Sequence, residues 1–397
     1  MSRAIRVLHV ASGDLWAGAE VQAFTLMSHL MRMPDTEVSA VLLNEGALAD
    51  RLGAAGVPVR VLDERKIAAP RILMQLRGIL RGWKPDVIHT HRQKENILGA
   101  LANRAGRNVP CVRTVHGASE RAGAAGWAGV RHRVVAGLDR WCGRTLQQRI
   151  IAVTRELGAR LSHEFPANKI AVIENGVDAE EVRRSAGVAE FRAAEPEATH
   201  IGIAGRLVAV KRVDLFIAAA ALLSHEFPQR RWKFHIFGEG PMRARLETLA
   251  DPCRLRDQVI FHGHRSDIAT CVGGLDVLVM CSDHEGMPMI ALEAAVLGIP
   301  TVAHAVGGLI EVVPQEFLVV RHDAPGYRDG ILRALRADGR SSLAKTRAAE
   351  IVVRYSAARN AEKVRALYEE VMAARDFGRT ERSRGGETGR GPRQENG

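Results

Sequence analysis

Short apolar runs alternate along this chain with longer segments of helical periodicity, and this alternation constrains the fold more than any other feature. A strand, a helix and a second strand pack as a parallel unit, with helices covering both faces of the sheet. Strands are expected at 5–10, 38–43, 57–62, 86–91, 109–115, 150–153 and 170–173, and again at 201–204, 234–237, 259–263, 275–280, 300–303 and 317–320. The sequence therefore predicts an α/β protein with two successive parallel sheets.

The chain is long enough, at 397 residues, for two domains of ordinary size. We expect an N-terminal domain over 1–184 and a C-terminal domain over 185–360, joined by a polar linker at 180–199. A helix is expected over 341–374, and its end at 361–376 is expected to pack back on the N-terminal domain. Residues 377–397 are rich in Arg, Gly, Glu and Ser, a composition that predicts disorder.

The loop between the strand at 275–280 and the apolar helix that follows it has the features of an anion site. Pro288 suits the first helical position, because its missing N–H costs nothing there. Gly286 lets the backbone turn tightly and approach a ligand. The backbone N–H groups of residues 289–291 would then point outward at a helix N-terminus, where anions bind.

Two carboxylates flank this expected anion site. Glu285 lies in the loop before the helix, and Glu293 lies a turn or more inside it. A ligand with hydroxyls on both sides of a phosphate fits this arrangement, and a nucleotide sugar has that shape. The alternative interpretation is that Glu285 caps the helix and Glu293 is a solvated surface charge.

Two further strand-to-helix loops could face a phosphate. Arg206 and Lys211 lie in the loop after the strand at 201–204, where two cations would neutralise a diphosphate and stabilise it as a leaving group. The small-residue loop that ends at Gly18 precedes the first helix, which is also a phosphate-approach position. The alternatives are a basic surface loop in the first case and an ordinary strand-to-helix turn without a ligand in the second.

The charge balance favours anionic partners. The net charge is +11 and the sequence pI is near 9.9, values that suit phosphorylated substrates, nucleic acid or an anionic membrane. Aromatic residues make up only 5%, and no recognition motif for nucleic acid appears, so we expect no nucleic-acid partner. The basic segment 131–149 contains an apolar stripe and could rest on anionic headgroups, or it could be a surface helix with a solvated basic side.

Three histidines lie at expected strand ends and could each face a site. His116 ends the strand at 109–115, and His89 and His91 end the strand at 86–91. Two histidines two residues apart could suggest a metal, but with no third ligand in view we interpret them as packing and hydrogen-bonding residues. No segment is apolar enough to span a membrane and no cleavable leader is seen, so a cytoplasmic protein is expected.

Together these motifs resemble the GT-B glycosyltransferases, specifically the large retaining family 4, also called group 1. The resemblance covers nearly the whole chain up to about residue 374. Its strongest motif is the spacing of Glu285 and Glu293, followed by Gly205-Arg206-Leu207 with Lys211. The other matching segments are Asn175-Gly176-Val177-Asp178, Gly238-Glu239-Gly240-Pro241, Gly307-Gly308, Gly18-Ala19-Glu20 and Thr114-Val115-His116-Gly117. Family members usually have two glycines before Ala-Glu, where this chain has Ala17-Gly18.

The resemblance implies two Rossmann-like parallel-sheet domains that face each other across a cleft. By resemblance, Arg206 and Lys211 would bind the donor diphosphate, Glu293 the ribose, and Glu285 with the following backbone the donor sugar. His116 would lie near the transferred sugar and the acceptor. The implied catalytic residues are His116, Glu285, Arg206 and Lys211, and the implied donor-binding residues are Gly18, Gly205, Arg206, Lys211, Glu285, Gly286, Met287, Pro288, Met289 and Glu293.

The implied activity is transfer of a sugar from a nucleotide-sugar donor to a hydroxyl of a glycan or lipid-linked acceptor, with the anomeric configuration retained. A UDP-sugar is favoured as donor and GDP-mannose is the second candidate; bacterial cell-surface polysaccharide or lipopolysaccharide synthesis is the expected setting. No Asp-x-Asp motif appears, which agrees with the family's metal-independent chemistry, and no cofactor is expected. A GT-B sugar-nucleotide epimerase and a non-catalytic nucleotide-sugar-binding protein stay open as alternatives.

Overall fold

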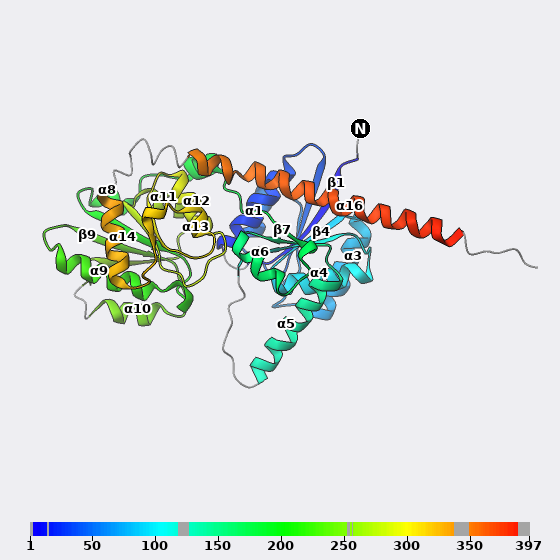
Figure 1. Ribbon diagram of the computed structural model, residues 1–397, viewed down its shortest axis with the longest axis horizontal. Helices are drawn as coiled ribbons and strands as arrows, with labels where there is room; N and C mark the ends of the chain where they lie inside the picture. Colours follow the sequence, from blue (N-terminus) through cyan, green and yellow to red (C-terminus); the bar gives the residue numbers. More distant parts are fainter. Residues whose placement is uncertain are drawn as a thin grey trace, which may run out of the picture.

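The strands of the protein form two parallel sheets that lie side by side (Figure 1). The computed structural model describes residues 3–13, 16–117, 127–251, 255, 257–336 and 349–387. Within these residues, one sheet has seven strands in the order β3-β2-β1-β4-β5-β6-β7, and the other has six in the order β10-β9-β8-β11-β12-β13. The strand order reverses beside β1 and beside β8, and such points are where open parallel sheets bind ligands. The α/β prediction is confirmed.

The N-terminal sheet is buried on both faces. Its strands are β1 (Ile5–Ala11), β2 (Thr36–Leu42), β3 (Val59–Val61), β4 (Val87–His91), β5 (Cys111–Val115), β6 (Arg149–Ala152) and β7 (Ile170–Val172); its helices are α1 (Gly18–Met31), α2 (Ala47–Ala54), α3 (Ala69–Trp83), α4 (Gln93–Ala105), α5 (Trp127–Thr145) and α6 (Arg155–Ser162). The successive β1 residues Val7 and Leu8 pack into different apolar clusters, one with Leu26 of α1 and the other with Leu76 of α3. Because side chains alternate along a strand, a strand covered on both faces is continuously apolar.

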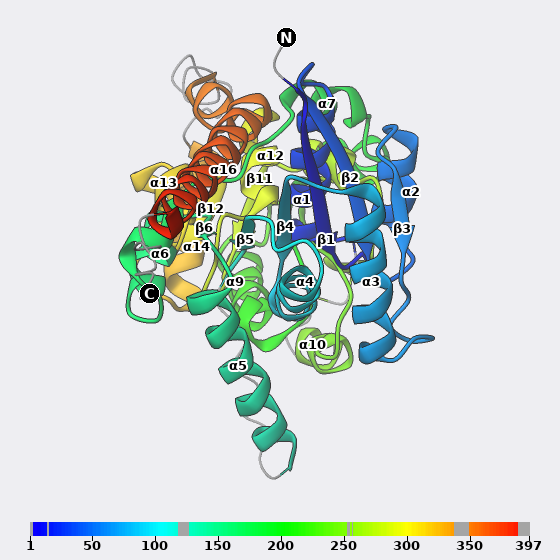
Figure 2. The same ribbon diagram turned by 90° about the vertical axis from the view of Figure 1, so that its right-hand side faces the viewer.

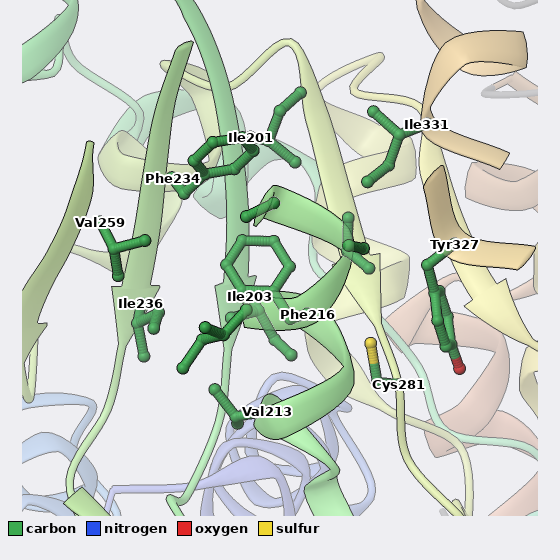
Figure 3. Packing of buried hydrophobic residues seen from close by; sticks show 14 of the residues in the cluster. Ile201, Ile203, Val213, Phe216, Phe234, Ile236, Val259, Cys281, Tyr327 and Ile331 are labelled. Atoms are coloured by element: carbon green, nitrogen blue, oxygen red, sulfur yellow. The ribbon is translucent and has the colours of Figure 1, made fainter. Parts of the chain in front are cut away.

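The C-terminal sheet has the same layered construction. Its elements are β8 (Thr199–Ala204), α9 (Val213–Glu226), β9 (Trp232–Phe237), α10 (Arg243–Ala250), β10 (Val259–Gly263), α11 (Ile268–Gly273), β11 (Val277–Met280), α12 (Met289–Val296), β12 (Thr301–His304), α13 (Leu309–Val312), β13 (Leu318–Val319) and α14 (Ala324–Arg336). Figure 3 shows Ile201 and Ile203 of β8 beside Phe234 and Ile236 of β9, with Phe216 of α9 packed over them. These alternate strand residues form one buried face of the sheet.

The segment expected as a linker at 180–199 contains two short helices. They are α7 (Ala179–Ser185) and α8 (Glu190–Ala194). The Asp178 carboxylate caps α7 by accepting a hydrogen bond from the Glu181 N–H at 3.1 Å. Short exposed helices have a polar composition like that of a linker, which is why the composition alone did not show them.

The helix expected over 341–374 is broken where the chain returns to the N-terminal unit. The backbone N–H of Val177 donates to the Tyr355 carbonyl at 2.7 Å, and the Ala357 N–H donates to the Val177 carbonyl at 3.0 Å. These bonds replace helical bonds at the crossing, and α16 (Ala357–Glu387) begins directly after it. Figures 1 and 2 both show α16 lying along the N-terminal unit.

The packing of α16 against the N-terminal unit includes buried polar contacts. The Tyr368 hydroxyl lies 2.5 Å from His89 Nδ1, and the Gln22 side-chain amide donates to Asn360 Oδ1 at 3.1 Å. The helix continues to Glu387. Disorder was expected for residues 377–397, but residues 377–387 are helical. Extending an existing helix costs far less than starting one. Residues 388–397 lie outside the described residues.

None of the described helices is long and apolar enough to cross a membrane.

Candidate active site

The expected catalytic residues all lie in loops at the carboxyl ends of strands. Arg206 and Lys211 follow β8, Glu285 follows β11, and His116 follows β5. Strands of both sheets therefore contribute side chains to one region, as expected for ligand sites in open parallel sheets.

The loops of the two units contact each other directly. The side-chain amide of Asn175 donates to the Met287 carbonyl at 2.9 Å, and the Gly307 N–H donates to Glu156 Oε2 at 2.8 Å. Asn175 and Glu156 belong to the N-terminal half of the chain, whereas Met287 and Gly307 belong to the C-terminal half. The Glu285 loop and the loop after β12 are thus each fixed by one of these hydrogen bonds from across the interface.

Two glycines allow this close meeting of loops. A Cβ on Gly286 would lie 2.0 Å from the His116 carbonyl oxygen, and a Cβ on Gly307 would lie 2.0 Å from the Glu285 carbonyl oxygen. Gly307 also has φ of 55°, a conformation that glycine adopts readily. A side chain at either position would push the Glu285 loop away from its neighbours.

The loop after β8 is held against the loop after β9. The Gly205 N–H donates to the Phe237 carbonyl and the Leu207 N–H donates to the Glu239 carbonyl, both at 2.9 Å. These bonds fix the backbone on both sides of Arg206, whose side chain is exposed. The structure thus presents a guanidinium group at the carboxyl end of β8.

Glu285 is the polar centre of this region. Its Oε1 accepts a hydrogen bond from Lys211 Nζ at 2.5 Å and from Ser282 Oγ at 2.6 Å. The Glu285 side chain is only 9% exposed, and that of Lys211 is 26% exposed. The capping alternative is wrong, because the residue that caps α12 is Pro288 and no side chain caps this helix. Instead, the carboxylate joins the loops after β8 and β11.

The start of α12 differs in detail from the expectation. Pro288 precedes the helix and is not its first residue. The Ala291 N–H donates to the Pro288 carbonyl at 3.2 Å, so one of the three N–H groups expected to be free is used. The side chains of Met287 and Met289 are buried in an apolar cluster. Any contact of these two residues with a ligand would therefore be made by the backbone.

Glu293 is buried inside α12, so the interpretation of a solvated surface charge is wrong. The residue is 9% exposed, and burial raises the pKa of its carboxyl to about 7. A carboxyl group that keeps its proton near neutrality can donate as well as accept hydrogen bonds.

His116 lies in line with other histidines. Its Nε2 is 3.2 Å from His91 Nδ1, and the two rings are stacked. Burial, with contributions from His91 and Arg92, lowers the pKa of His116 well below its ordinary value. The imidazole is therefore neutral near pH 7.

The structure adds a third histidine, His9, to the pair His89 and His91. Ring nitrogens of the three lie within 4.8 Å of one another, a separation at which they could hold a metal ion. However, both nitrogens of His89 are engaged, by the Tyr368 hydroxyl at 2.5 Å and by Thr114 Oγ1 at 2.7 Å. His9 Nδ1 faces His91 Nε2 at 3.1 Å. These bonds favour the packing and hydrogen-bonding interpretation over a metal site.

Gly18, expected to approach the donor phosphate, begins α1 and is exposed. A Cβ there would meet no atom of the described residues within 4 Å, so contacts with these residues do not require a glycine. Four polar residues that the sequence analysis did not name as site residues lie nearby, after β1 and β4. Glu20 pairs with Arg92, and Ser12 donates to the buried carboxyl of Glu95. The sequence does not show these two contacts, because they depend on β1 and β4 being neighbouring strands.

Family models match most of the chain. A model described as glycosyl transferases group 1 matches residues 190–370, and one described as glycosyltransferase family 4 matches residues 16–181. Together they cover all strands of both sheets except β1, and the loops that carry His116, Arg206, Lys211 and Glu285.

Curated relatives resemble the chain over most of its length. A D-inositol 3-phosphate glycosyltransferase from Saccharomonospora viridis is 30% identical over 392 residues, covering 90% of this chain and 86% of the relative. The UDP-Gal:alpha-D-GlcNAc-diphosphoundecaprenol alpha-1,3-galactosyltransferase of Escherichia coli is 25% identical over 385 residues, covering 92% and 96%. Among solved structures, HepE from Anabaena in complex with UDP superposes with a TM-score of 0.75 at 18% identity, over 92% of this chain and all of that chain.

Proposed function

This chain belongs to the group 1 glycosyltransferases of family 4 and has the GT-B fold, and on that premise we propose that it transfers a sugar from a nucleotide-sugar donor to a hydroxyl of a glycan or lipid-linked acceptor. A UDP-sugar is the favoured donor and GDP-mannose is the second candidate. The proposed setting is the synthesis of bacterial cell-surface polysaccharide or lipopolysaccharide. The proposed reaction retains the anomeric configuration.

One observation supports the donor assignment most directly. The loop after β8 and the loop after β11 are joined through Lys211 and Glu285, with the exposed Arg206 in the first of them. A diphosphate at this place would be neutralised by two cations, and the adjacent carboxylate could accept hydrogen bonds from sugar hydroxyls. The carboxylate now holds the Lys211 ammonium group in position, so the cation is pre-organised for the diphosphate.

The choice of UDP-sugar and acceptor is supported by similarity. The Escherichia coli relative is named for UDP-Gal and for a diphosphoundecaprenol-linked acceptor, and HepE has been solved in complex with UDP and with UDP-glucose. We carry the nucleotide and the lipid-linked acceptor class over to this chain as a proposal.

The proposed chemistry follows from the placement of these groups. The bond between the anomeric carbon and the phosphate oxygen breaks, and a bond to the acceptor oxygen forms on the same face of the sugar. The acceptor's hydroxyl proton leaves with the nucleoside diphosphate. Arg206 and Lys211 would stabilise the charge on the departing diphosphate, without a metal ion, because preorganised cations stabilise charge that develops as a bond breaks. Glu285 and His116 would hold the transferred sugar.

We also propose that α5 rests on an anionic membrane from the cytoplasmic side. The helix projects from the N-terminal unit in both views (Figures 1 and 2). Large apolar side chains are exposed along one face of it, at Val130, Val134, Leu138 and Trp141. Exposed arginines lie on the same helix, at 131, 133, 140 and 144. An apolar stripe flanked by cations suits the headgroup region; residues 118–126, which precede the helix, lie outside the described residues.

The membrane proposal is tested by vesicle sedimentation. Binding to vesicles containing phosphatidylglycerol should fall steeply as salt rises, and a Val134→Ser, Leu138→Ser variant should bind more weakly. Val320→Ser, which removes a side chain that is 84% exposed on the C-terminal unit, is the matched control. Vesicle binding that changes neither with salt concentration nor with the α5 substitutions would contradict the proposal.

The transferase proposal is tested by release of nucleoside diphosphate. UDP should be released from a UDP-sugar only when an acceptor is present, with a glycoside bond of unchanged anomeric configuration in the product. Epimerised donor without acceptor consumption would support the epimerase alternative. Donor binding without turnover, over a panel of lipid-linked and glycan acceptors, would support the non-catalytic alternative.

A further inference from the structure

A row of three hydrogen-bonded imidazoles crosses the N-terminal sheet and ends at the candidate active site. His9, His91 and His116 lie on β1, β4 and directly after β5, which are neighbouring strands in this order. His9 Nδ1 lies 3.1 Å from His91 Nε2, and His91 Nδ1 lies 3.2 Å from His116 Nε2. His91 therefore uses both of its ring nitrogens within the row.

The two outer nitrogens of the row are buried. Among the described residues, neither His9 Nε2 nor His116 Nδ1 has a hydrogen-bond partner. His9 lies inside the sheet, whereas the backbone of His116 meets Gly286 of the Glu285 loop. Only the His116 end of the row is therefore next to the place where a ligand oxygen would bind.

A neutral imidazole has one donor and one acceptor nitrogen, so the row has two polarities. In one, His9 Nε2 carries an unpaired buried N–H and His116 Nδ1 is a lone pair. In the other, His9 Nε2 is a lone pair and His116 Nδ1 carries the hydrogen. Each polarity leaves one outer N–H without a partner in the protein, and unpaired buried N–H groups are rare. At His9 that N–H would stay inside the sheet, whereas at His116 it lies next to the Glu285 loop, where a ligand oxygen would accept it, which favours the second polarity.

We propose that His9 and His91 are positioning residues, which hold His116 in the tautomer with hydrogen on Nδ1 so that it donates a hydrogen bond to an oxygen of the bound substrates. The part of this inference that concerns substrate rests on the proposed transferase function. The part that concerns the tautomer does not. In this arrangement His116 supplies a fixed donor and does not take a proton from the acceptor hydroxyl.

The surroundings keep the row neutral. Burial lowers the pKa of all three histidines, and the Arg92 guanidinium lowers those of His91 and His116 further. His89 stacks on His91 with ring centroids 4.5 Å apart, but its nitrogens bind hydroxyl groups and stay outside the row. A neutral row keeps a single polarity, because an extra proton on His91 or His116 would remove the acceptor that the preceding ring needs.

Two conservative substitutions of His91 separate positioning from packing. An Asn side-chain amide reaches the position of Nδ1, so His91→Asn keeps a donor toward His116. A Gln amide reaches the position of Nε2, so His91→Gln keeps the contact with His9 and loses the one with His116. We expect His91→Gln to lower kcat about tenfold, the effect of losing one hydrogen bond, and His91→Asn to stay within about threefold of wild type.

The tautomer itself is read by nitrogen NMR of the full chain labelled with ¹⁵N-histidine, without any ligand. The expected result is that His116, assigned from the spectrum of His116→Gln, has hydrogen on Nδ1 in wild type and in His91→Asn, and a tautomer mixture in His91→Gln. His200→Gln removes an inter-histidine bond in the other sheet and should leave the His116 signal unchanged. Hydrogen on His116 Nε2 in wild type, or no effect of His91→Gln, would overturn the inference even if the protein proves to have no transferase activity.

Discussion

Lys211 Nζ lies 2.5 Å from Glu285 Oε1, so the cation proposed to hold the donor diphosphate is paired with the carboxylate proposed to hold the donor sugar. The pair joins the loops after β8 and β11. Residues that interact this closely do not contribute independently, so the effects of removing each should not add.

The first prediction concerns the two cations. Arg206→Ala and Lys211→Ala should each lower kcat by around a hundredfold, about 3 kcal/mol, because each removes a group that stabilises the departing diphosphate. The free energy of unfolding, measured in urea, should change less than the barrier does, because Arg206 is exposed and because the Glu285 carboxylate keeps its hydrogen bond from Ser282 when Lys211 is removed. A double variant that turns over like wild type would exclude the assignment.

The second prediction separates the two glutamates. Glu293→Gln should weaken donor affinity most, because the ribose does not react, although remote binding energy also contributes to turnover. Glu285→Gln should lower the single-turnover rate more than donor affinity, because the sugar develops charge as it moves. Calorimetry and rapid-quench kinetics measure the two quantities. Wild-type values of both quantities in both variants would mean that these glutamates are structural.

The third prediction concerns stability and the pKa of Glu293, which burial raises to about 7. Between about pH 4.5 and 7 the folded state holds a proton that the unfolded state releases, so the contribution of Glu293 to stability falls as pH rises through this window. The total change is about 3 kcal/mol. Glu293→Gln should remove it, so wild type should lose more stability than this variant in urea melts between pH 4.5 and 8. Parallel curves for the two proteins would contradict the burial of an ionisable carboxyl.

The fourth prediction concerns a histidine row in the other sheet. His200 Nε2 donates to the Glu195 carbonyl at 2.9 Å, and His200, His235 and His262 are linked by two bonds of 2.8 Å. Burial and the neighbouring histidines lower the pKa of His235 to about 2. Below about pH 6.5 this histidine is therefore protonated in the unfolded chain and stays neutral in the folded chain, so stability is lost as pH falls.

The size of this effect is set by the pH interval. Between pH 6.5 and 5, one histidine that stays neutral costs about 2 kcal/mol of unfolding free energy. At pH 7.5, His235→Phe should be less stable than wild type, because it breaks two hydrogen bonds. Between pH 7.5 and 5, however, its unfolding free energy should fall by about 2 kcal/mol less than that of wild type. Exposed His163→Gln is the control. If the unfolding free energy of His235→Phe fell as much between pH 7.5 and 5 as that of wild type, the role of His235 would be contradicted.

Much of the fold could be predicted because each strand is a local pattern. The runs at Ile5–Ala11 and Val277–Met280 are buried on both faces, so their sequences are apolar apart from Arg6 and His9 in the first, and they are easily recognised. The break before α16 could not be predicted, because it depends on backbone bonds to Val177, which is remote in sequence. The same is true of α16 packing through Tyr368 on His89.

The candidate site could be predicted as a set of loops but not as a set of contacts. Lys211 and Glu285 each follow a strand, and strand ends are local features, yet their pairing requires β8 and β11 to be neighbours. His9 was missed because it lies within an apolar strand, 82 residues from His91. A polar residue at a buried strand position was the available signal, since such residues need a hydrogen-bond partner.

We propose above that the loops joined by Lys211 and Glu285 bind the diphosphate of a nucleotide-sugar donor. Titration calorimetry of UDP into the full chain tests this most directly, with GDP as the second nucleotide. We expect UDP to bind wild type saturably and to bind Lys211→Ala at least tenfold more weakly. Binding to Lys363→Ala, which breaks an ion pair with Glu174 instead, should be unchanged. The proposal would be contradicted if neither UDP nor GDP bound, or if wild type and Lys211→Ala bound the nucleotide with equal affinity.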